Sequence, residues 1–148
     1  MKYFLSLFLL IGFLFAGSIS ALPAFEQPLD RAEKSALVLH VRILSEQTER
    51  LNSVASAVRL EIQLIDVLRN KAGYNARSIR VLHFLVQPNS FESGMRTPPG
   101  PGEWIIFLNI ENVRMDGTVV PVPVLYRPAP FAFFRFDGSV AEDIRKLP

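Results

Sequence analysis

The sequence contains no cysteine. The protein therefore forms no disulfide bond, has no thiol nucleophile and offers no thiolate ligand to zinc. A lipid anchor attached through a cysteine is excluded as well. Small secreted domains often depend on disulfides, so this chain must hold its fold by packing alone. With 49% hydrophobic residues, 12 of the 148 residues being Phe, it has the material for a core.

The sequence also lacks an excess of charge of one sign. It has 16 Lys and Arg against 14 Asp and Glu, and the basic residues form no block. Nucleic-acid-binding surfaces carry a basic patch or stripe, so we expect no nucleic-acid partner. The low charge and high apolar content also exclude an intrinsically disordered chain.

Enzyme motifs are missing too. The sequence has no H-E-x-x-H, no P-loop, no dinucleotide-binding fingerprint and no G-x-S-x-G. Its strand carboxylates Glu61, Asp66 and Glu103 are scattered singly. We therefore predict no catalytic residue, no cofactor and no enzymatic activity. Asp66 fits either a buried carboxyl group or a bulge residue that is hydrogen-bonded to the backbone.

The two histidines leave one alternative open. His40 and His83 each interrupt an apolar strand, and they would meet if the two strands paired. A small periplasmic hydrolase or metal-binding protein that uses both is the alternative function. Two ligands are fewer than a zinc site needs, so we predict no metal site.

The longest apolar run lies at the N-terminus. Lys2 precedes an apolar stretch from Tyr3 to Phe15, and small residues follow. A basic start, a short apolar core and a small-residue exit are typical of a secretory signal peptide. The run is shorter than the ~20 residues of a membrane span.

These features predict two segments. We expect residues 1–21 to be a signal peptide, with cleavage after Ser20 or Ala21; an uncleaved membrane anchor is the alternative. We expect residues 22–148 to be a single domain that is exported to the periplasm or the extracellular space. No stable membrane anchor remains after cleavage.

Strand-like segments dominate the rest of the chain. Period-two alternation or dense β-branched and aromatic residues predict strands at 36–45, 56–70, 77–87, 103–113, 119–126 and 131–136. Residues 46–52 are interpreted as a polar connection. The alternation of the second segment slips by one at Ile65-Asp66 and resumes with Val67, which predicts a bulge.

Two prolines predict an edge strand. Pro121 and Pro123 lie two apart, so both missing N–H groups fall on the same edge, which cannot take a neighbour. Asp137-Gly138 is a turn signal. Asp30 is a candidate cap for a short helical turn.

The C-terminus has the pattern of a helix. Val140, Ile144 and Leu147 give it one apolar stripe. Together with the strands, this helix predicts an all-β domain with small α content, built as a small five- to six-stranded barrel that ends in a short C-terminal helix.

Four stretches carry a resemblance to a known family. They are "ALVLHVRIL", "VRLEIQLIDVLRN", "SIRVLHF" and "PGPGEWIIFLN", between about residues 36 and 144. In this order they resemble the tissue-inhibitor-of-metalloproteinases-like, netrin-module-like domains of exported bacterial proteins. The resemblance implies an OB-like Greek-key barrel.

The closest match is at residues 102–108, where the family has Gly-Glu, an aromatic residue and an apolar run. Val41 and Asn70 stand where the family has glycine, and Asn is the residue that tolerates a left-handed conformation next best. The animal inhibitors of the family coordinate a protease's zinc through an N-terminal cysteine. Since this chain has no cysteine, that mechanism is carried over to no residue here.

The same match places Trp104, the only tryptophan. Gly102 allows the chain to turn where a side chain would clash. Trp104, Ile106 and Leu108 fall on one face of the strand, and Ile105 and Phe107 on the other. A strand that is apolar on both faces is typical of a central position, so we expect Trp104 to point into the core.

Two segments are candidates for binding a partner. The first is the aromatic tract with Tyr126, Phe131 and Phe133, which is either a core strand under the C-terminal helix or a partner surface. The second is the Pro-rich loop 88–102 with Met95 and Arg96, which is either a stiff binding loop or a plain connector. We therefore expect an exported, non-catalytic binding or interaction module of the cell envelope, with a protein partner or a second copy of itself.

Overall fold

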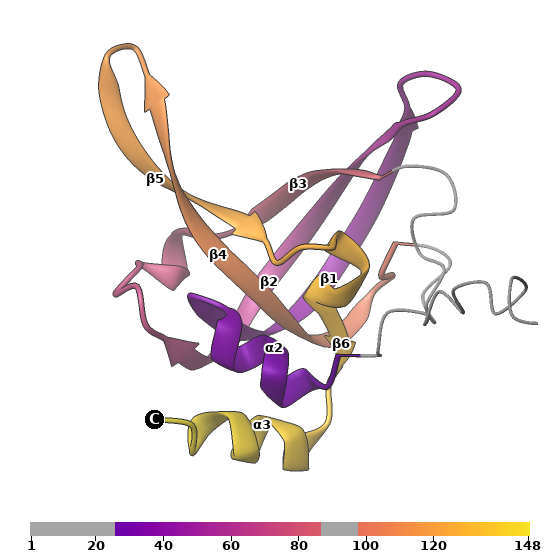
Figure 1. Ribbon diagram of the computed structural model, residues 1–148. Coiled ribbons are helices and arrows are strands. Elements are labelled where there is room, and N and C mark those ends of the chain that lie inside the picture. The colour runs from indigo at the N-terminus through magenta and orange to yellow at the C-terminus, as the bar shows by residue number, and fades with distance from the viewer. Residues whose placement is uncertain (1–25, 87–97) are drawn as a thin grey trace, which may run out of the picture.

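The computed structural model describes residues 26–86 and 98–148 (Figure 1). The elements in chain order are α2 (Pro28–Lys34), β1 (Leu37–Arg50), β2 (Ser56–Asn70), η1 (Ala76–Ser78), β3 (Val81–Val86), β4 (Gly102–Met115), β5 (Thr118–Leu125), η2 (Ala129–Ala132), β6 (Phe133–Arg135) and α3 (Gly138–Arg145). The prediction of an all-β domain with small α content and a short C-terminal helix is confirmed. The expected signal peptide, Met95 and Arg96 lie outside the described residues.

The strands form one antiparallel sheet with the order β3-β2-β1-β4-β5, and β6 pairs with β4. The fourth strand lies beside the first, which is the Greek-key order. The predicted Greek key and strand number are therefore correct. The predicted barrel closure is wrong, because within the described residues no ladder joins the outer strands β3 and β5.

Two prolines explain why the sheet stays open. The N–H of Tyr126 donates to the carbonyl of Phe107 at 3.0 Å, so the neighbouring pair Leu108–Leu125 is of the non-hydrogen-bonded type. Because hydrogen-bonded and non-hydrogen-bonded pairs alternate along the ladder, the backbone nitrogen and carbonyl groups of Pro121 and Pro123 also point away from β4. The outer edge of β5 therefore lacks two N–H donors, which confirms the predicted edge strand and removes half of the ladder that closure needs.

The predicted bulge in β2 is confirmed. The register of β1 against β2 shifts between His40 and Val41, and Ile65 has no partner there. A second shift leaves Leu68 without a partner. Leu68 is buried, on the same face as Leu60 and Ile62, and Val67 is exposed, so the prediction that the apolar face resumes with Val67 is wrong.

The polar connection predicted at 46–52 is mostly strand. β1 continues to Arg50, which pairs with Ser56 of β2. Its outer half is solvent-exposed, so it needs no apolar face. The ladder alone satisfies its backbone, and polar side chains therefore do not end the strand.

The first half of β4 is the centre of the core. All five residues from Trp104 to Leu108 are buried, between β1 on one edge and β6 on the other. The indole N–H of Trp104 donates to the carbonyl of Gly100 at 2.9 Å, and the guanidinium of Arg135 lies 5.0 Å from its ring centroid. The φ of Gly102 is 137°, a conformation that favours glycine. The predicted central strand with a buried tryptophan is confirmed.

α2 starts earlier than predicted. Its first residue is Pro28, with Gln27 in the capping position, and Asp30 lies inside the first turn. Proline is favoured at the first helical position because its missing N–H has no helical partner there. The proline therefore marks the start, and the proposed Asp30 cap is wrong.

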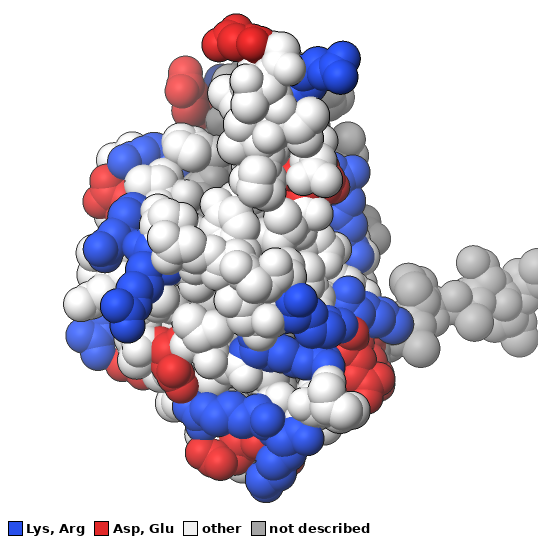
Figure 2. All heavy atoms as spheres, turned by 90° about the vertical axis from the view of Figure 1, so that its left-hand side faces the viewer, with Lys and Arg blue, Asp and Glu red and all other residues white. Residues whose placement is uncertain are grey.

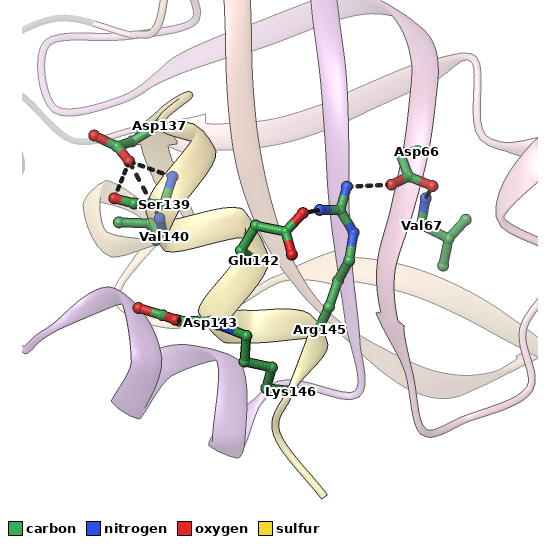
Figure 3. A network of polar contacts seen from close by, with 9 residues as sticks. All are labelled: Asp66, Val67, Asp137, Ser139, Val140, Glu142, Asp143, Arg145 and Lys146. Atoms are coloured by element: carbon green, nitrogen blue, oxygen red, sulfur yellow. Dashed lines mark hydrogen bonds and ion pairs between the residues drawn. The ribbon is translucent and has the colours of Figure 1, made fainter.

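α3 is fixed at both ends by charged residues (Figure 3). The carboxylate of Asp137 accepts the N–H groups of Ser139 at 2.8 Å and Val140 at 3.1 Å, so the predicted turn residue is a helix cap. Near the other end, Arg145 donates to Glu142 of its own helix and to Asp66 of β2. The predicted apolar stripe packs on the core through Ile144, which is buried.

Of the two interpretations of Asp66, the structure supports a bulge residue that is hydrogen-bonded to the backbone. One carboxylate oxygen accepts the N–H of Val67 at 2.8 Å, and the other accepts Arg145 at 2.6 Å. The hydrogen bond from Arg145 lowers the pKa of Asp66, and the bond from Val67 adds to this. The side chain is partly exposed, so this carboxylate helps to dock α3 and is not isolated in the core.

A buried arginine ties the start of the domain to its end. Nε and Nη2 of Arg31 in α2 donate to the carbonyl of Glu26 at 2.9 and 2.6 Å, and Nη1 donates to the carbonyl of Phe131 at 3.0 Å. The guanidinium also lies 5.1 Å from the ring centroid of Phe131. These contacts offset the cost of burying a charge.

The left-handed residue after β2 is Gly73, with φ 62°, and not Asn70. Asn70 uses its side chain instead. Its amide donates to the carbonyl of Tyr74 at 2.9 Å and accepts the N–H of Tyr74 at 3.0 Å. An Asn side chain that closes a turn in this way needs no unusual backbone.

Candidate functional site

A groove lies where the sheet fails to close. It has a volume of about 680 Å³, which is the size of many ligand sites. One wall comes from β3, and the other comes from the end of β5 and the segment that leads into η2. The lining residues are His83, Phe84, Leu85, Val124, Leu125, Arg127, Pro128 and Ala129.

The groove rests on the core. The ring of Phe84 packs against that of Phe133, with centroids 5.6 Å apart, and Leu125 is buried. Leu85 is 66% exposed and forms part of the rim. The groove therefore has a fixed apolar base and an accessible apolar border, the combination found in binding sites that are largely pre-formed.

The β3 wall presents backbone hydrogen-bonding groups. The N–H of Ile62 donates to the carbonyl of Arg80 at 2.9 Å, so the neighbouring pair Glu61–Val81 is of the non-hydrogen-bonded type. By alternation, the N–H and C=O groups of Val81, His83 and Leu85 point away from β2. No strand of the described residues pairs with this edge. Such a row of groups is a template for one more strand.

The charge of the lining has one sign. Arg127 is exposed just after β5, His83 is exposed on β3, and none of the described residues that line the groove is acidic. The groove is therefore suited to an apolar chain that carries a carboxylate, because an incoming cation would meet a like charge and no partner.

The predicted aromatic tract lies beside the groove without lining it. Phe133 is 2% exposed and Tyr126 is 9% exposed, and both belong to the core; Phe131 is half-buried. The tract therefore supports the groove from below, which is the core interpretation of these residues. The lining comes from neighbours in the sequence that had no signal of their own, above all Arg127 and Ala129.

Tyr126 also contacts the N-terminal part of the domain. Its hydroxyl donates to the carboxylate of Glu26 at 3.0 Å, and that carboxylate is paired with Lys34. Burial raises the pKa of Tyr126, and the bond to Glu26 raises it further. The ion pair with Lys34 lowers the pKa of Glu26. This cluster fixes the chain just before the groove.

The two histidines do not form a common site. His40 lies on β1 opposite Asp66, and His83 lies on β3 opposite Arg59. The two β2 positions are seven residues apart, which is roughly 23 Å along a strand. In residues 26–86 and 98–148, no group of three or more acidic, His or Cys side chains is placed to hold a metal ion. The idea that both histidines meet is therefore wrong.

His40 has a local partner instead. Its Nε2 lies 3.1 Å from Glu103, and its ring stacks on Phe136 with centroids 3.7 Å apart. Glu103 also accepts Arg42 at 2.7 Å. The bond from Arg42 and the contact with His40 lower the pKa of Glu103. The set joins β1, β4 and the chain after β6, and His40 is covered from solvent.

A second exposed apolar surface lies on the arm, the part of the β4–β5 hairpin beyond β1 (residues 109–121). Its exposed apolar side chains are Val113, Met115, Val119 and Val120. The arm projects from the body in Figure 1, and the face of it that Figure 2 shows is mostly uncharged, with charged side chains at its tip. Its tight turn at Asp116 and Gly117 has φ values of 49° and 82°, as the commonest hairpin turn requires.

No protein-family model and no curated protein matches the chain. In the described part of the chain, no helix is long and apolar enough to cross a membrane. The functional proposal therefore rests on the groove and the residues around it.

Proposed function

We propose that the protein is an exported, non-catalytic binding module of the cell envelope, and that the groove between β3 and β5 takes its protein partner. One observation carries the proposal. In the part of the chain that the structure describes, two strand edges face the same apolar groove without pairing, and one of them keeps its outward backbone donors and acceptors. Soluble proteins normally cover such an edge or block it, as the prolines block β5.

The chemistry of the groove favours a polypeptide over a small substrate. A strand edge offers evenly spaced hydrogen bonds that match the backbone of an extended chain. Among the described residues, the lining has one arginine and one exposed histidine, and it includes no acid or hydroxyl to form a catalytic arrangement with them. The closely paired polar residues, His40 with Glu103, lie on other elements and hold those elements together.

Export and family are part of the same proposal. Residues 1–21 have the pattern of a signal peptide, and the Greek-key sheet is compatible with the resemblance to netrin-module-like domains. The mass of the exported protein tests the first point. We expect a chain that starts at Ala21 or Leu22. A chain that keeps residues 1–20 in the membrane fraction would contradict export as a cleaved protein.

Site-specific photocrosslinking in the producing cell tests the groove. A benzoylphenylalanine replaces Leu85 on the groove rim, and in a control chain it replaces Met115 on the arm. The two side chains are similarly exposed, at 66% and 56%. We expect a discrete crosslinked product of higher mass from position 85 only. Equal products from both positions, or none from position 85, would show that the groove is not the binding site.

A further inference from the structure

We propose, on the basis of the function proposed above, that the partner supplies one extended acidic strand. It pairs with the outer edge of β3, and a carboxylate on it binds Arg127. The partner is thus a polypeptide segment with alternating apolar and polar residues and at least one Asp or Glu. Three features of the groove lead to this description.

The first feature is the asymmetry of the two edges. β3 directs the N–H and C=O groups of Val81, His83 and Leu85 outward. On β5, Pro121 and Pro123 remove two of the outward donors. An added strand therefore finds a complete set of hydrogen-bonding groups on β3 and an incomplete one on β5, so it pairs on one side only.

The second feature is the alternation of β3. Leu82 and Val86 are buried and Phe84 is half-buried, whereas His83 and Leu85 are exposed. A strand that continues the sheet has its side chains on the same two faces as its neighbour. Every second residue of the partner therefore faces the apolar interior, and the residues between them face solvent.

The third feature is the charge. Arg127 is exposed and lines the groove, and no carboxylate from residues 26–86 or 98–148 lines it. A guanidinium pairs with a carboxylate through two parallel hydrogen bonds, which an amide or hydroxyl cannot match. A carboxylate on the partner is the complementary group, and it distinguishes an acidic segment from a neutral or basic one.

Selection from a displayed peptide library tests the proposal. The full chain is immobilised and exposed to random peptides of about twelve residues, twice the length of an average strand. We expect the enriched peptides to contain Asp or Glu within an alternating apolar pattern. The tightest binder is then synthesised, together with a version in which Lys replaces its acidic residue.

Two variants of one residue test the strand pairing. His83→Pro removes an outward N–H that β2 does not use, whereas His83→Ala removes only the imidazole. We expect His83→Pro to weaken peptide binding about tenfold or more, because the edge of β3 loses its central hydrogen-bond donor. We expect His83→Ala to change the Kd less than about threefold. In the wild type, the amides of Val81, His83 and Leu85 should exchange more slowly with the peptide bound. Equal loss in both variants with unchanged exchange would overturn the pairing.

Charge reversal tests the carboxylate. Arg127→Glu should weaken the binding of the acidic peptide about tenfold and should bind the lysine version more tightly than the acidic one. Arg114→Glu on the arm serves as the control, and we expect it to change the affinity for neither peptide. Peptides that lack an acid, or that bind Arg127→Glu as well as the wild type, would overturn the acidic segment. If such peptides bind and position 85 still crosslinks, the groove remains the site and only the strand chemistry is wrong. If neither occurs, the proposed function fails with it.

A second copy of the chain is the rival occupant. Sedimentation of the full chain distinguishes it, because a strand supplied by another copy makes a dimer. A monomer that binds the acidic peptide supports the proposal. A dimer that the peptide fails to dissociate would overturn it.

Discussion

The two halves of β4 are one continuous strand in opposite surroundings. From Gly102 to Leu108 the strand pairs with β1 on one edge, β6 pairs with residues 104–106 on the other, and every side chain from Trp104 to Leu108 is buried. From Asn109 to Met115 it pairs with β5 alone and forms one side of the projecting arm. The first half is apolar at each position from Trp104 to Leu108, while the second mixes polar residues with apolar ones that remain exposed.

The difference shows that the contribution of a strand to stability depends on the elements that pack against it, and not on its strand propensity. Both halves keep their ladder hydrogen bonds, but only the first removes apolar surface from water. Burial contributes about 25 cal/mol per Å², so the first half supplies most of the stabilisation. The second half is free to change without unfolding the domain.

Truncating Trp104 should give the largest effect. Trp104→Ala leaves a cavity in the core and should cost roughly 3–5 kcal/mol, a large part of the ~5–15 kcal/mol that stabilises a domain. On the arm, Val113→Ala should stay within about 0.5 kcal/mol. Urea denaturation of both variants measures the two values. Equal midpoints would mean that the halves of β4 do not differ in this way.

The burial of Trp104 also illustrates what the sequence could predict. The run "WIIFL" has no polar position, so the central strand followed from the pattern. The slip at Ile65 and the proline pair likewise predicted the bulge and the edge strand. These features are local, because each depends on residues within one strand.

Features that join distant segments could not be predicted. One partner of Arg31 is a backbone carbonyl 100 residues away, and no side-chain pattern indicates it. The groove combines β3 with residues 124–129, which only the sheet order brings together. The barrel prediction failed for a related reason. Pro121 and Pro123 were interpreted for their own strand, but their consequence for closure depends on which strand would lie next to them.

Two arginines provide a second, smaller contrast. Arg31 is buried near the first half of β4, with its guanidinium 5.9 Å from the ring centroid of Phe107. Arg31→Ala leaves the carbonyls of Glu26 and Phe131 without this donor and should cost about 1–3 kcal/mol. Arg114→Ala on the arm should be nearly neutral. Thermal unfolding measures the loss of stability in both variants. Similar losses would show that the buried contacts of Arg31 do not stabilise the fold.

Gly117 tests whether the arm is an independent unit. Its φ of 82° is strained for other residues, so Gly117→Ala should weaken the hairpin turn by about 1 kcal/mol. Hydrogen exchange should become faster for the amides of the arm and stay unchanged for Trp104 to Leu108. Faster exchange throughout the sheet would show that the halves of β4 unfold together.

The smallest expected effect is a pH dependence at Glu103, at the start of β4. Arg42 and His40 lower the pKa of Glu103 from its ordinary 4.5. The carboxylate therefore stabilises the fold above pH 4.5, and this contribution is lost as the pH falls through the lowered pKa. Glu103→Gln should reduce the urea midpoint at pH 7 and approach the wild type at pH 3. A difference that is the same at both values would exclude the carboxylate charge as the cause.

The contact between Arg31 and Phe131 has a consequence for the order in which the molecule is completed. The chain is synthesised from its N-terminus, so α2 exists long before Phe131 does. One edge of β1 can pair early with β2. Its other edge stays unpaired until β4 has been synthesised. Contacts between distant parts of a chain form slowly, and partial chains expose the surface that those contacts later bury. The helix α2 is therefore made early, but it is among the last of the described elements to reach its final surroundings.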